Sequence, residues 1–365
     1  MKILTVIGTR PEIIRLSLII KKLDACSEHV LVHTGQNFSE SLNDIFFKEL
    51  GIRSPDYYLG AKPSMFGEQV SIILREIEKI FLDVRPDKVL ILGDTNSGLS
   101  AVAAERLGIP VYHMEAGNRC FDMKVPEEIN RRVIDSVSSF ALPYTVLSRE
   151  NLLREGISKA RILVCGNPIY EVMDFFMDKI NRSCILEILG VKEKQYFLAT
   201  VHRAENVDKK ERLEQIIRGI MNVGQQHNIP VIMSVHPRTR SRMEQFCLKA
   251  ENSCIRFMEP FGFLDFVKLE KHAVCVLTDS GTVQEECCIL GVPTVTVRDT
   301  TERPETVECG SNIVSGINPA RIAECTKIML SSSKVWTCPD GYAVKNVSER
   351  VAKFILGNYE EIGLY

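Results

Sequence analysis

The sequence of 365 residues lacks a long hydrophobic run and an excess of charge of either sign. No stretch reaches the ~18 consecutive apolar residues that a membrane-spanning helix needs. The N-terminus, MKILTVIGTRPE, has no long apolar region and no small-residue cleavage site, so we expect no signal peptide and a cytoplasmic protein. Lys and Arg total 45, and Asp and Glu total 47, so the formal net charge is −2. General binding to nucleic acid or to a membrane surface would need a basic excess, and we expect neither partner.

Paired metal-binding and nucleotide-binding motifs are also missing. The twelve cysteines are scattered without a C-x-x-C pair, and Cys165, Cys275 and Cys287 lie in apolar runs. We therefore expect no structural zinc and predict buried, reduced thiols. The sequence has no G-x-G-x-x-G, no P-loop, no H-E-x-x-H and no G-x-S-x-G. These absences give no support to a dinucleotide cofactor, a P-loop NTPase, a zinc protease or a serine hydrolase.

The composition and the pattern of apolar segments indicate a globular α/β protein with two domains. Hydrophobic residues make up 45% and charged residues 25%, which excludes a disordered or fibrous chain. Short apolar runs alternate with amphipathic helical stretches, and this pattern starts again after about residue 170. Repeated β-then-α units predict parallel sheets covered on both faces. The fold class is therefore two doubly wound, Rossmann-like domains, with an intervening cleft.

The expected strands and helices are short enough to be assigned one by one. Strands are predicted at Lys2–Ile7, Val30–His33, Lys88–Leu92, Val111–Met114, Ile162–Cys165, Tyr196–Val201, Val231–Val235, Ala273–Thr278 and Pro293–Val297. Helical spacing of apolar residues predicts helices after Pro11, at Gly67–Leu82, from Ser97, at Glu127–Ser136, at Lys210–Val223, from Thr282 and at Ala343–Leu356.

Polar residues collect where the predicted strands end, which is where doubly wound sheets bind ligands. In the first half these residues are Thr9, Arg10, Asp94, Thr95, Asn96, His113 and Glu115; in the second half they are His202, Arg203, His236, Arg238, Asp279, Ser280, Gly281, Glu285, Glu286, Arg298, Glu302 and Arg303. Any one of them is explained equally well as a solvated loop charge or a helix cap. Such clusters at seven of the predicted strand ends indicate a site.

The two halves predict different chemistry. Asp279 to Thr282 opens a helix, where backbone N–H groups, a hydroxyl and the helix dipole favour a phosphate, although a plain N-cap is the simpler alternative. Glu285 and Glu286 follow one to two turns after the helix start. A carboxylate at that place suits hydrogen bonds from the two hydroxyl groups of a vicinal diol, such as a ribose. The first half supplies Asp94, Glu115, Glu127 and Glu128, which suit acid–base chemistry on a sugar carried by a nucleotide.

Motifs along nearly the whole chain resemble those of the non-hydrolysing UDP-N-acetylglucosamine 2-epimerases. Order and spacing are kept in GTRPE (8–12), HTGQ (33–36), GDTNS (93–97), H-x-EAG (113–117), PEE-x-NR (126–131), HRAEN (202–206), HPRTR (236–240), LTDSG-x-x-QEE (277–286), GVP (291–293) and RDTTERPE (298–305). The hydrolysing members of the wider superfamily lack the GTRPE opening, which favours the non-hydrolysing branch.

The resemblance implies a GT-B-like fold and an isomerase that needs no cofactor and no metal. It places an N-terminal domain at 1–170, completed by a C-terminal helix at 343–365, and a UDP-binding domain at 171–342. It implies that C2 of a UDP-N-acetylhexosamine is inverted by anti elimination of UDP to a 2-acetamidoglucal, followed by re-addition. A homodimer is typical of the family.

The family's functional residues fall on matching positions of this sequence. The acid–base carboxylates fall on Asp94, Glu115 and Glu127, and the catalytic histidine on His202. Substrate-binding positions fall on Arg10, Arg131, His236, Arg238, Phe266 (against uracil), Ser280, Gly281, Thr282, Glu286 (on the ribose), Arg298, Glu302 and Arg303. Which carboxylate removes the proton and which returns it is left open.

Some positions depart from the commonest family pattern. Thr282 stands where Gly is usual, Arg15 where Lys is frequent and Asn37 where His is frequent; the last two lie near an allosteric UDP-GlcNAc site in bacterial members. Because Arg and Lys are not interchangeable at a charged site, allosteric activation is not predicted.

The segment EAGNRCFD (115–122) resembles the branch of the family that acts on 6-deoxy sugars. In that branch Asn118 and Cys120 would line the path to the sugar. The alternative substrate is therefore UDP-2-acetamido-2,6-dideoxy-L-talose, which gives UDP-N-acetyl-L-fucosamine. Two other functions are less favoured: a GT-B glycosyltransferase would need an acceptor cleft, and a nucleotide-sugar sensor would lack an acid–base residue, whereas all are present.

Overall fold

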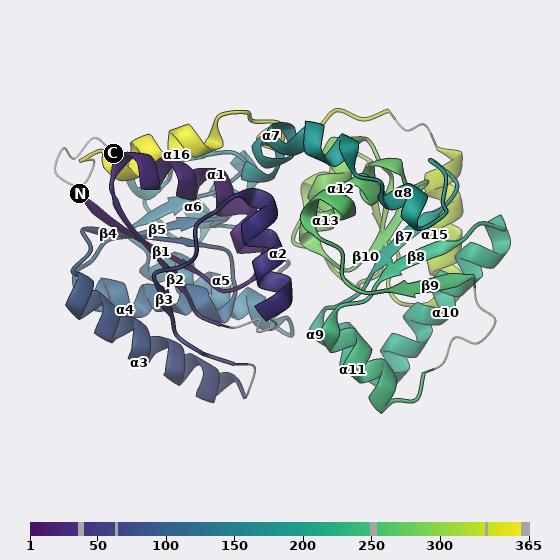
Figure 1. Ribbon diagram of the computed structural model, residues 1–365, viewed down its shortest axis with the longest axis horizontal. Helices are drawn as coiled ribbons and strands as arrows, with labels where there is room; N and C mark the ends of the chain where they lie inside the picture. The colour runs from purple at the N-terminus through teal and green to yellow at the C-terminus, as the bar shows by residue number, and fades with distance from the viewer. Residues whose placement is uncertain (36–39, 63–64, 249–253, 333–334, 359–365) are drawn as a thin grey trace. The chain divides into compact units, whose positions relative to one another are not determined.

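The computed structural model describes residues 1–35, 40–62, 65–248, 254–332 and 335–358. The chain divides into two compact units, of which the first comprises Met1–Phe175 and the chain from Asp340 onward, and the second comprises Phe176–Pro339 (Figure 1). Each unit contains one six-stranded parallel sheet. None of the described helices is long and apolar enough to cross a membrane.

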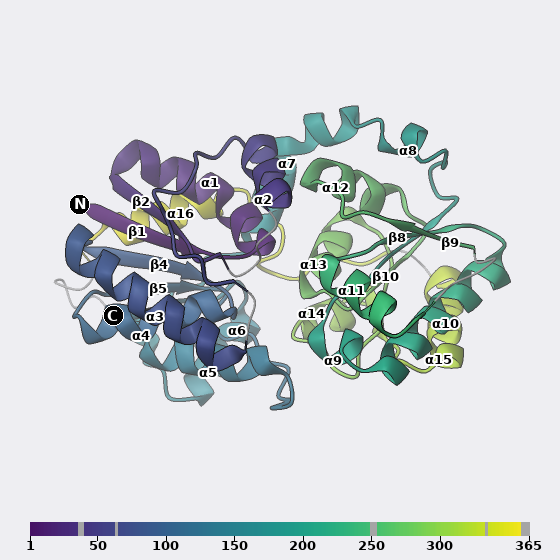
Figure 2. The same ribbon diagram turned by 60° about the horizontal axis from the view of Figure 1, so that its bottom comes forward.

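The first unit has the strand order β3-β2-β1-β4-β5-β6. Its strands are β1 (Lys2–Ile7), β2 (Glu28–His33), β3 (Tyr57–Tyr58), β4 (Lys88–Leu92), β5 (Val111–Met114) and β6 (Phe140–Leu142). Its helices are α1 (Arg10–Cys26), α2 (Glu40–Leu50), α3 (Phe66–Val84), the 3₁₀ turn η1 (Asn96–Leu99), α4 (Ser100–Arg106), α5 (Pro126–Val137), α6 (Val146–Arg154), the 3₁₀ turn η2 (Lys159–Arg161) and α16 (Val347–Leu356). Helices α1 and α16 pack together on one face of the sheet, and α3, α4 and α5 cover the other (Figure 2).

The second unit has the strand order β12-β11-β10-β7-β8-β9. This is the same topology read in reverse, because β7 to β12 correspond in turn to β1 to β6. Its strands are β7 (Phe197–Thr200), β8 (Val231–Ser234), β9 (Ile255–Met258), β10 (Val276–Thr278), β11 (Thr294–Thr296) and β12 (Asn312–Val314). Its helices are α8 (Ile185–Ile188), α9 (Ala204–Val207), α10 (Lys210–His227), α11 (Pro237–Gln245), α12 (Phe263–His272), α13 (Gly281–Leu290), α14 (Pro304–Glu308) and α15 (Pro319–Ser331). Helix α7 (Pro168–Arg182) carries the chain from the first unit into the second.

The central strands are buried on both faces, and this is why their sequences are continuous apolar runs. Every residue of β4 and β5 is buried, and so is every residue of β7 and β8. Proline occupies the first turn of α1, α5, α11, α14 and α15, where its missing N–H costs nothing. Gly291, at φ +71°, ends α13 in the left-handed conformation that glycine adopts without strain.

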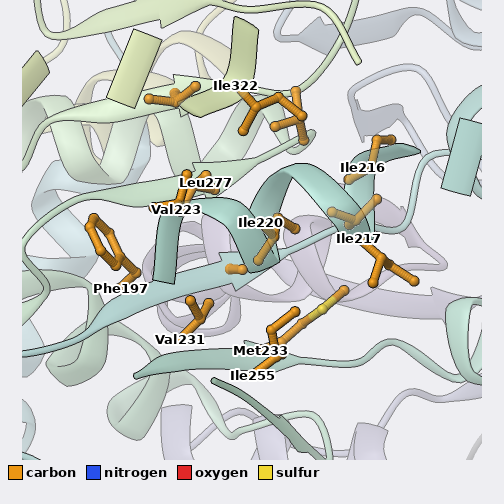
Figure 3. Packing of buried hydrophobic residues seen from close by; sticks show 14 of the residues in the cluster. Phe197, Ile216, Ile217, Ile220, Val223, Val231, Met233, Ile255, Leu277 and Ile322 are labelled. Atoms are coloured by element: carbon orange, nitrogen blue, oxygen red, sulfur yellow. The ribbon is translucent and has the colours of Figure 1, made fainter. Parts of the chain in front are cut away.

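The largest apolar layer of the second unit lies between the sheet and the helices α10 and α15. Figure 3 shows Ile216, Ile220 and Val223 of α10 close to Leu277 and to Ile322 of α15. A second layer, which includes Leu269, Val283 and Cys287, fills the space under α12 and α13. The sheet of this unit is thereby fixed from both sides, and its strand ends are held in register.

The structure corrects several of the predicted elements. Ile162–Cys165 is not a strand, because Ile162 makes only an isolated bridge to Ala141 and the sixth strand is β6 instead. The C-terminal helix begins at Val347 rather than Ala343. The short strands β3, β9 and β12 were not predicted, since two to four residues at a sheet edge give little periodic signal. The strands Lys2–Ile7, Lys88–Leu92 and Val111–Met114 are confirmed.

Truncation of Ile220 tests the central layer of the second unit. Ile220 is fully buried between α10 and the sheet, so Ile220→Ala leaves a cavity and should lower the free energy of unfolding by about 3 kcal/mol. Urea unfolding followed by fluorescence of the single tryptophan, Trp336, measures this loss in the unit that contains it. Ile328→Ala on α15, where the side chain is 42% exposed, is the control and should change it by less than about 1 kcal/mol. Equal effects of the two substitutions would contradict this packing.

Candidate active site

In each sheet the strand order reverses between two neighbouring strands. This place is called the topological switch point, and ligands bind there at the carboxyl ends of the strands. In the first unit this point lies between β1 and β4, and in the second between β7 and β10. The residues that follow β1 and β4 include Arg10 and Asp94. Those that follow β7 and β10 include His202 and Ser280. These four predicted site residues therefore lie at the topological switch points, and the other predicted residues follow neighbouring strands or lie on helices.

A buried carboxylate, Glu12, joins the two strand ends of the first unit. It accepts hydrogen bonds from the backbone N–H groups of Gly8 and Thr9 (the latter 3.0 Å), which follow β1, and from the Thr95 hydroxyl (2.6 Å), which follows β4. Burial raises the pKa of Glu12 to about 7, against the opposing effect of these hydrogen bonds. Glu12 thus fixes the loops that carry Arg10 and Asp94.

Asp94 is held by an arginine from α5. The two guanidinium nitrogens of buried Arg131 bind Asp94 at 2.6 Å and Glu128 at 2.8 Å. Asn130 donates to the Asp94 carbonyl at 2.9 Å. Burial would raise the pKa of Glu128, but hydrogen bonds from the Cys120 N–H and from Arg131 hold it below its usual value. Helix α5 therefore orients Asp94, and it also carries half-buried Glu127 in its first turn.

Glu115 lies directly after β5 in an unusual backbone conformation. Its φ is +67°, and its buried carboxylate forms an ion pair with buried Arg15 of α1. The Arg15 guanidinium also lies 5.7 Å from the centre of the Tyr144 ring. A left-handed residue other than glycine at a strand end is strained, and such strain concentrates at functional sites. Two residues on, Gly117 is required at φ +80°, because a Cβ atom there would collide with the Ser148 carbonyl.

His113 serves the framework rather than the strand-end surface. Its ring nitrogens contact Asp135 (2.8 Å) and the Gly93 carbonyl (2.9 Å), and all three groups are buried. Asp135 also accepts from the Gly117 N–H (3.1 Å) and from Arg119 (2.7 Å). Burial tends to raise the pKa of Asp135, but His113 and Arg119 hold it below its usual value. This network fixes the start of the EAG loop beside β4.

A second buried carboxylate, Asp279, joins the strand ends of the second unit. It follows β10 and accepts from the backbone N–H groups of His202 (3.0 Å) and Arg203 (2.9 Å), which follow β7. Asn206 donates to it at 3.1 Å. Burial raises the pKa of Asp279, and these hydrogen bonds oppose the rise. The alternative that Asp279 caps the following helix is wrong, because its oxygens hold the His202 loop.

Arginines and glutamates alternate around this carboxylate. Glu302 binds Arg298 at 2.6 Å and Arg203 at 2.7 Å. Arg303 binds Glu285 at 2.5 Å. All of these side chains except Arg203 are buried. Of the two carboxylates considered for a ribose contact, Glu285 therefore binds Arg303, whereas Glu286 lies against Glu270.

Helix α13 begins at the end of β10, as an anion site requires. Ser280 is its N-cap residue, and Gly281 and Thr282 form the first turn. The Ser280 side chain forms no capping hydrogen bond. A Cβ atom on Gly281 would lie 2.5 Å from Glu302 Oε1, so a larger residue would displace the carboxylate that binds Arg298 and Arg203. At the N-cap of α13, Ser280 therefore places a hydroxyl that is not used as a cap.

Glu286, farther along α13, adjoins a second buried carboxyl group that sequence reasoning missed. Glu270 on α12 is fully buried. Burial and the neighbouring Glu286 raise the pKa of Glu270 well above its usual value. When Glu270 is neutral, the two neighbouring carboxyl groups carry one negative charge between them.

The remaining predicted residues occupy the surrounding loops and helices. The His236 ring lies 5.7 Å from the His202 ring and accepts from the Arg238 N–H at the start of α11. Arg238 is exposed and pairs with Asp208. Phe266 on α12 packs against the apolar layer under α12 and α13. Arg10 begins α1, 5.8 Å from the centre of the Phe46 ring, and burial lowers its pKa.

Sequence reasoning gave no role to the residues that position the others. These are Glu12, Arg203, Glu270 and Asp135, and only Glu12 and Arg203 stood inside a recognised motif. Among residues the structure describes, no group of three or more His, Cys, Asp or Glu side chains is arranged to hold a metal ion. Asn37, one of the two positions that lie near an allosteric site in bacterial family members, is outside the described residues, and so is Gln36 of the HTGQ motif.

Comparison with known proteins decides the family. A family model described as UDP-N-acetylglucosamine 2-epimerase matches residues 21–356. The UDP-N-acetylglucosamine 2-epimerase of Methanocaldococcus jannaschii is 44% identical over 349 residues, which is 93% of this chain and 95% of the relative. This chain belongs to the UDP-N-acetylglucosamine 2-epimerase family.

Further relatives within the family bear on the fold and on the substrate. A crystal structure of the M. jannaschii epimerase in complex with UDP-GlcNAc and UDP superposes with a TM-score of 0.93 at 42% identity, covering 97% of this chain and 99% of that one. The predicted GT-B-like α/β fold is thereby confirmed. The UDP-2,3-diacetamido-2,3-dideoxy-D-glucuronate 2-epimerase of Pseudomonas aeruginosa is 38% identical over 97% of this chain and 99% of the relative.

The raised pKa of Glu12 makes stability depend on pH. With its folded-state pKa near 7 and an ordinary value of 4.5, this group contributes stability in full below about pH 4.5, and the contribution is lost as the pH rises through about 7. Glu12→Gln removes that dependence. Between pH 5 and pH 8, the free energy of unfolding of the variant should gain about 1–3 kcal/mol relative to the parent. Urea unfolding at both pH values measures the gain, and parallel pH profiles would refute it.

Proposed function

We propose that this protein is a non-hydrolysing 2-epimerase that interconverts UDP-GlcNAc and UDP-ManNAc. The observation that carries the proposal is the pairing of Asp94 with Arg131 and of Glu115 with Arg15, at neighbouring strand ends of the first unit. Family membership and the UDP-GlcNAc and UDP bound to the M. jannaschii relative support the same substrate.

The chemistry explains why a pair of carboxylates is needed. The C2 proton of the sugar has no adjacent carbonyl to stabilise a carbanion, so simple deprotonation is too slow. Anti elimination of UDP gives a 2-acetamidoglucal instead, and re-addition of UDP with protonation at C2 from the opposite face inverts that centre. One group must remove a proton and another must supply one on the other face of the ring.

We assign the acid–base roles to Asp94, Glu115 and Glu127, and a catalytic role to His202. Arg131 and Arg15 fix the orientation of the first two carboxylates. Because buried side chains hold both arginines, the carboxylates do not need to reorganise when the substrate binds.

We assign UDP binding to the second unit together with Arg10. The first turn of α13 would take the diphosphate, and the Glu286 carboxylate the ribose hydroxyls. Other groups proposed to contact the nucleotide or sugar are Arg131, His236, Arg238, Phe266 on uracil, Ser280, Gly281, Thr282, Arg298, Glu302 and Arg303. In this assignment the domain at 1–170 with 343–365 performs the proton transfers, and the domain at 171–342 holds UDP.

The sugar itself has one other supported candidate. The relative that acts on a diacetamido-glucuronate is 38% identical over nearly the whole chain, so a UDP-linked uronate is the second substrate to test. The 6-deoxy talose alternative depends on the segment EAGNRCFD (115–122), in which Asn118 and Cys120 would line the path to the sugar. In the structure Asn118 accepts from Ser148 (2.8 Å), and the Cys120 N–H donates to Glu128 (3.0 Å), which shows that both residues support the loop.

We also propose a homodimer in a reducing compartment. The dimer follows from the family resemblance, and light scattering would distinguish one copy of 41.2 kDa from two. All twelve cysteines are free thiols, which suits the cytoplasm.

Incubation with UDP-GlcNAc in deuterated water tests the function. Loss of the C2 proton signal in the NMR spectrum, with appearance of a ManNAc anomeric signal, is the expected result. If the protein binds UDP but exchanges no C2 proton, the GlcNAc assignment is wrong, and the diacetamido-uronate and 6-deoxy talose substrates are compared next.

Neutral replacement of the paired carboxylates tests their roles. Asp94→Asn and Glu115→Gln should each lower the rate of C2 exchange by about 10²–10⁴-fold, because proton transfer loses its acceptor or donor. UDP binding should persist, since neither residue belongs to the second unit. Glu78→Gln, at an exposed position on α3, is the matched control and should exchange at the parent rate. Near-normal rates in both test variants would rule out the assignment.

The Glu286 assignment is tested by affinity for UDP. Glu286→Gln loses a charged acceptor for the ribose hydroxyls, and the dissociation constant should rise about 10- to 100-fold. Isothermal titration measures it, with Glu214→Gln on the exposed face of α10 as the control. An unchanged constant for Glu286→Gln would remove this residue from the nucleotide site.

A further inference from the structure

Three of the twelve cysteines meet in the second unit, although they are far apart in the sequence. The Cys288 sulfur on α13 lies 3.7 Å from the Cys309 sulfur, at the end of α14. Cys338 follows α15 and lies 3.6 Å from the Cys288 carbonyl. The Cys338 and Cys288 thiols also hydrogen-bond to each other. Nothing in the proposed epimerase chemistry uses these sulfurs.

The thiols differ in reactivity for physical reasons. The hydrogen bond from the Cys288 thiol lowers the pKa of Cys338 to about 7 and raises that of Cys288. Cys338 is half-buried, so solvent reaches it, whereas Cys288 is buried. Neighbouring Cys287 lies in the apolar core, and burial raises its pKa well above the usual value. A thiolate that solvent reaches is the form that oxidants attack.

We propose that Cys338 and Cys288 are an oxidisable thiol pair, and that a peroxide converts them into a disulfide that fastens the segment 335–338 to α13. The Cys338 thiolate attacks hydrogen peroxide, the O–O bond breaks, and a sulfenic acid and hydroxide form. The Cys288 sulfur then attacks the Cys338 sulfur, the S–S bond forms and the S–O bond breaks. Hydroxide leaves with the Cys288 proton as water. Two thiols and one peroxide thus give one disulfide and two waters.

The surroundings of the pair already hold this segment against the helix. The Trp336 indole N–H donates to the Cys288 carbonyl at 3.0 Å. Beyond Pro339 the chain enters the first unit, where the Gly341 carbonyl accepts from the Asn167 N–H at 2.8 Å. The disulfide would therefore make permanent a contact between α13, which begins at the proposed diphosphate site, and the segment that leaves the second unit.

Cys309 is the alternative partner of Cys288, because their sulfurs are also close. A disulfide between Cys288 and Cys309 would form if Cys309 were oxidised first, or if its thiolate displaced Cys338 from a disulfide with Cys288. Cys309 shares the partial exposure and the contact with Cys288. We assign the first bond to Cys338 because Trp336 and Cys338 both contact the Cys288 carbonyl and hold the segment 335–338 against α13, and because the lowered pKa of Cys338 gives it thiolate character. Peptide mapping distinguishes the two bonds.

The test is oxidation of the whole protein with one equivalent of hydrogen peroxide. The expected result is the loss of two of the twelve titratable thiols. Non-reducing tryptic mapping should join fragment 335–345, which contains Cys338, to fragment 272–298, and sequencing of the joined peptides should place the bond on Cys288 rather than on Cys275 or Cys287. Because Trp336 is the only tryptophan, its emission should fall when the disulfide forms beside it and recover with dithiothreitol.

Variants supply the controls without relying on a buried substitution. Cys338→Ser should abolish both the link and the change in emission, whereas Cys184→Ser, at an exposed position far along the chain, should keep both. A map that joins Cys288 to Cys309 and leaves Cys338 reduced would overturn the proposal. So would the same thiol loss and quenching in Cys338→Ser. None of these measurements depends on epimerase activity.

Discussion

One buried carboxylate at each topological switch point holds the strand ends together, and the rest of the site depends on these two groups. Glu12 ties the loop after β1 to the loop after β4, and Asp279 ties the loop after β10 to the loop after β7. A buried carboxylate without such donors would be very costly. The donors are backbone N–H groups of the loops after the strands. Because these groups bind a buried carboxylate, the loops are held in place where the chemistry is proposed.

Arginine pairs extend this order outward from the two carboxylates. In the first unit Arg131 and Arg15 orient Asp94 and Glu115, and in the second unit Arg298 and Arg203 share Glu302. Each pair satisfies groups that burial has removed from water, and removing one partner would leave an uncompensated charge.

Sequence patterns predicted the inner strands well and the edge strands badly. Lys88–Leu92 and Val111–Met114 were correctly bounded because strands covered on both faces are continuous apolar runs between clear breaks. Ile162–Cys165 has the same composition but is not a strand: it follows the edge strand β6 with a single isolated bridge, between Ile162 and Ala141, and no continuous ladder. Which apolar run pairs at an edge depends on the neighbours available in three dimensions, and no local pattern records them.

The sequence by itself determined the parallel α/β architecture, the family and the positions at which reactive side chains follow strands, because these depend on periodicity and on motifs a few residues long. Only the tertiary structure decided what those side chains touch. Glu285 and Glu286 are adjacent in the chain, yet one binds Arg303 and the other lies against Glu270. Cys338 and Cys288 meet across 50 residues of sequence. Such contacts arise from the packing of distant segments, and packing follows from the whole sheet rather than from any local run of residues.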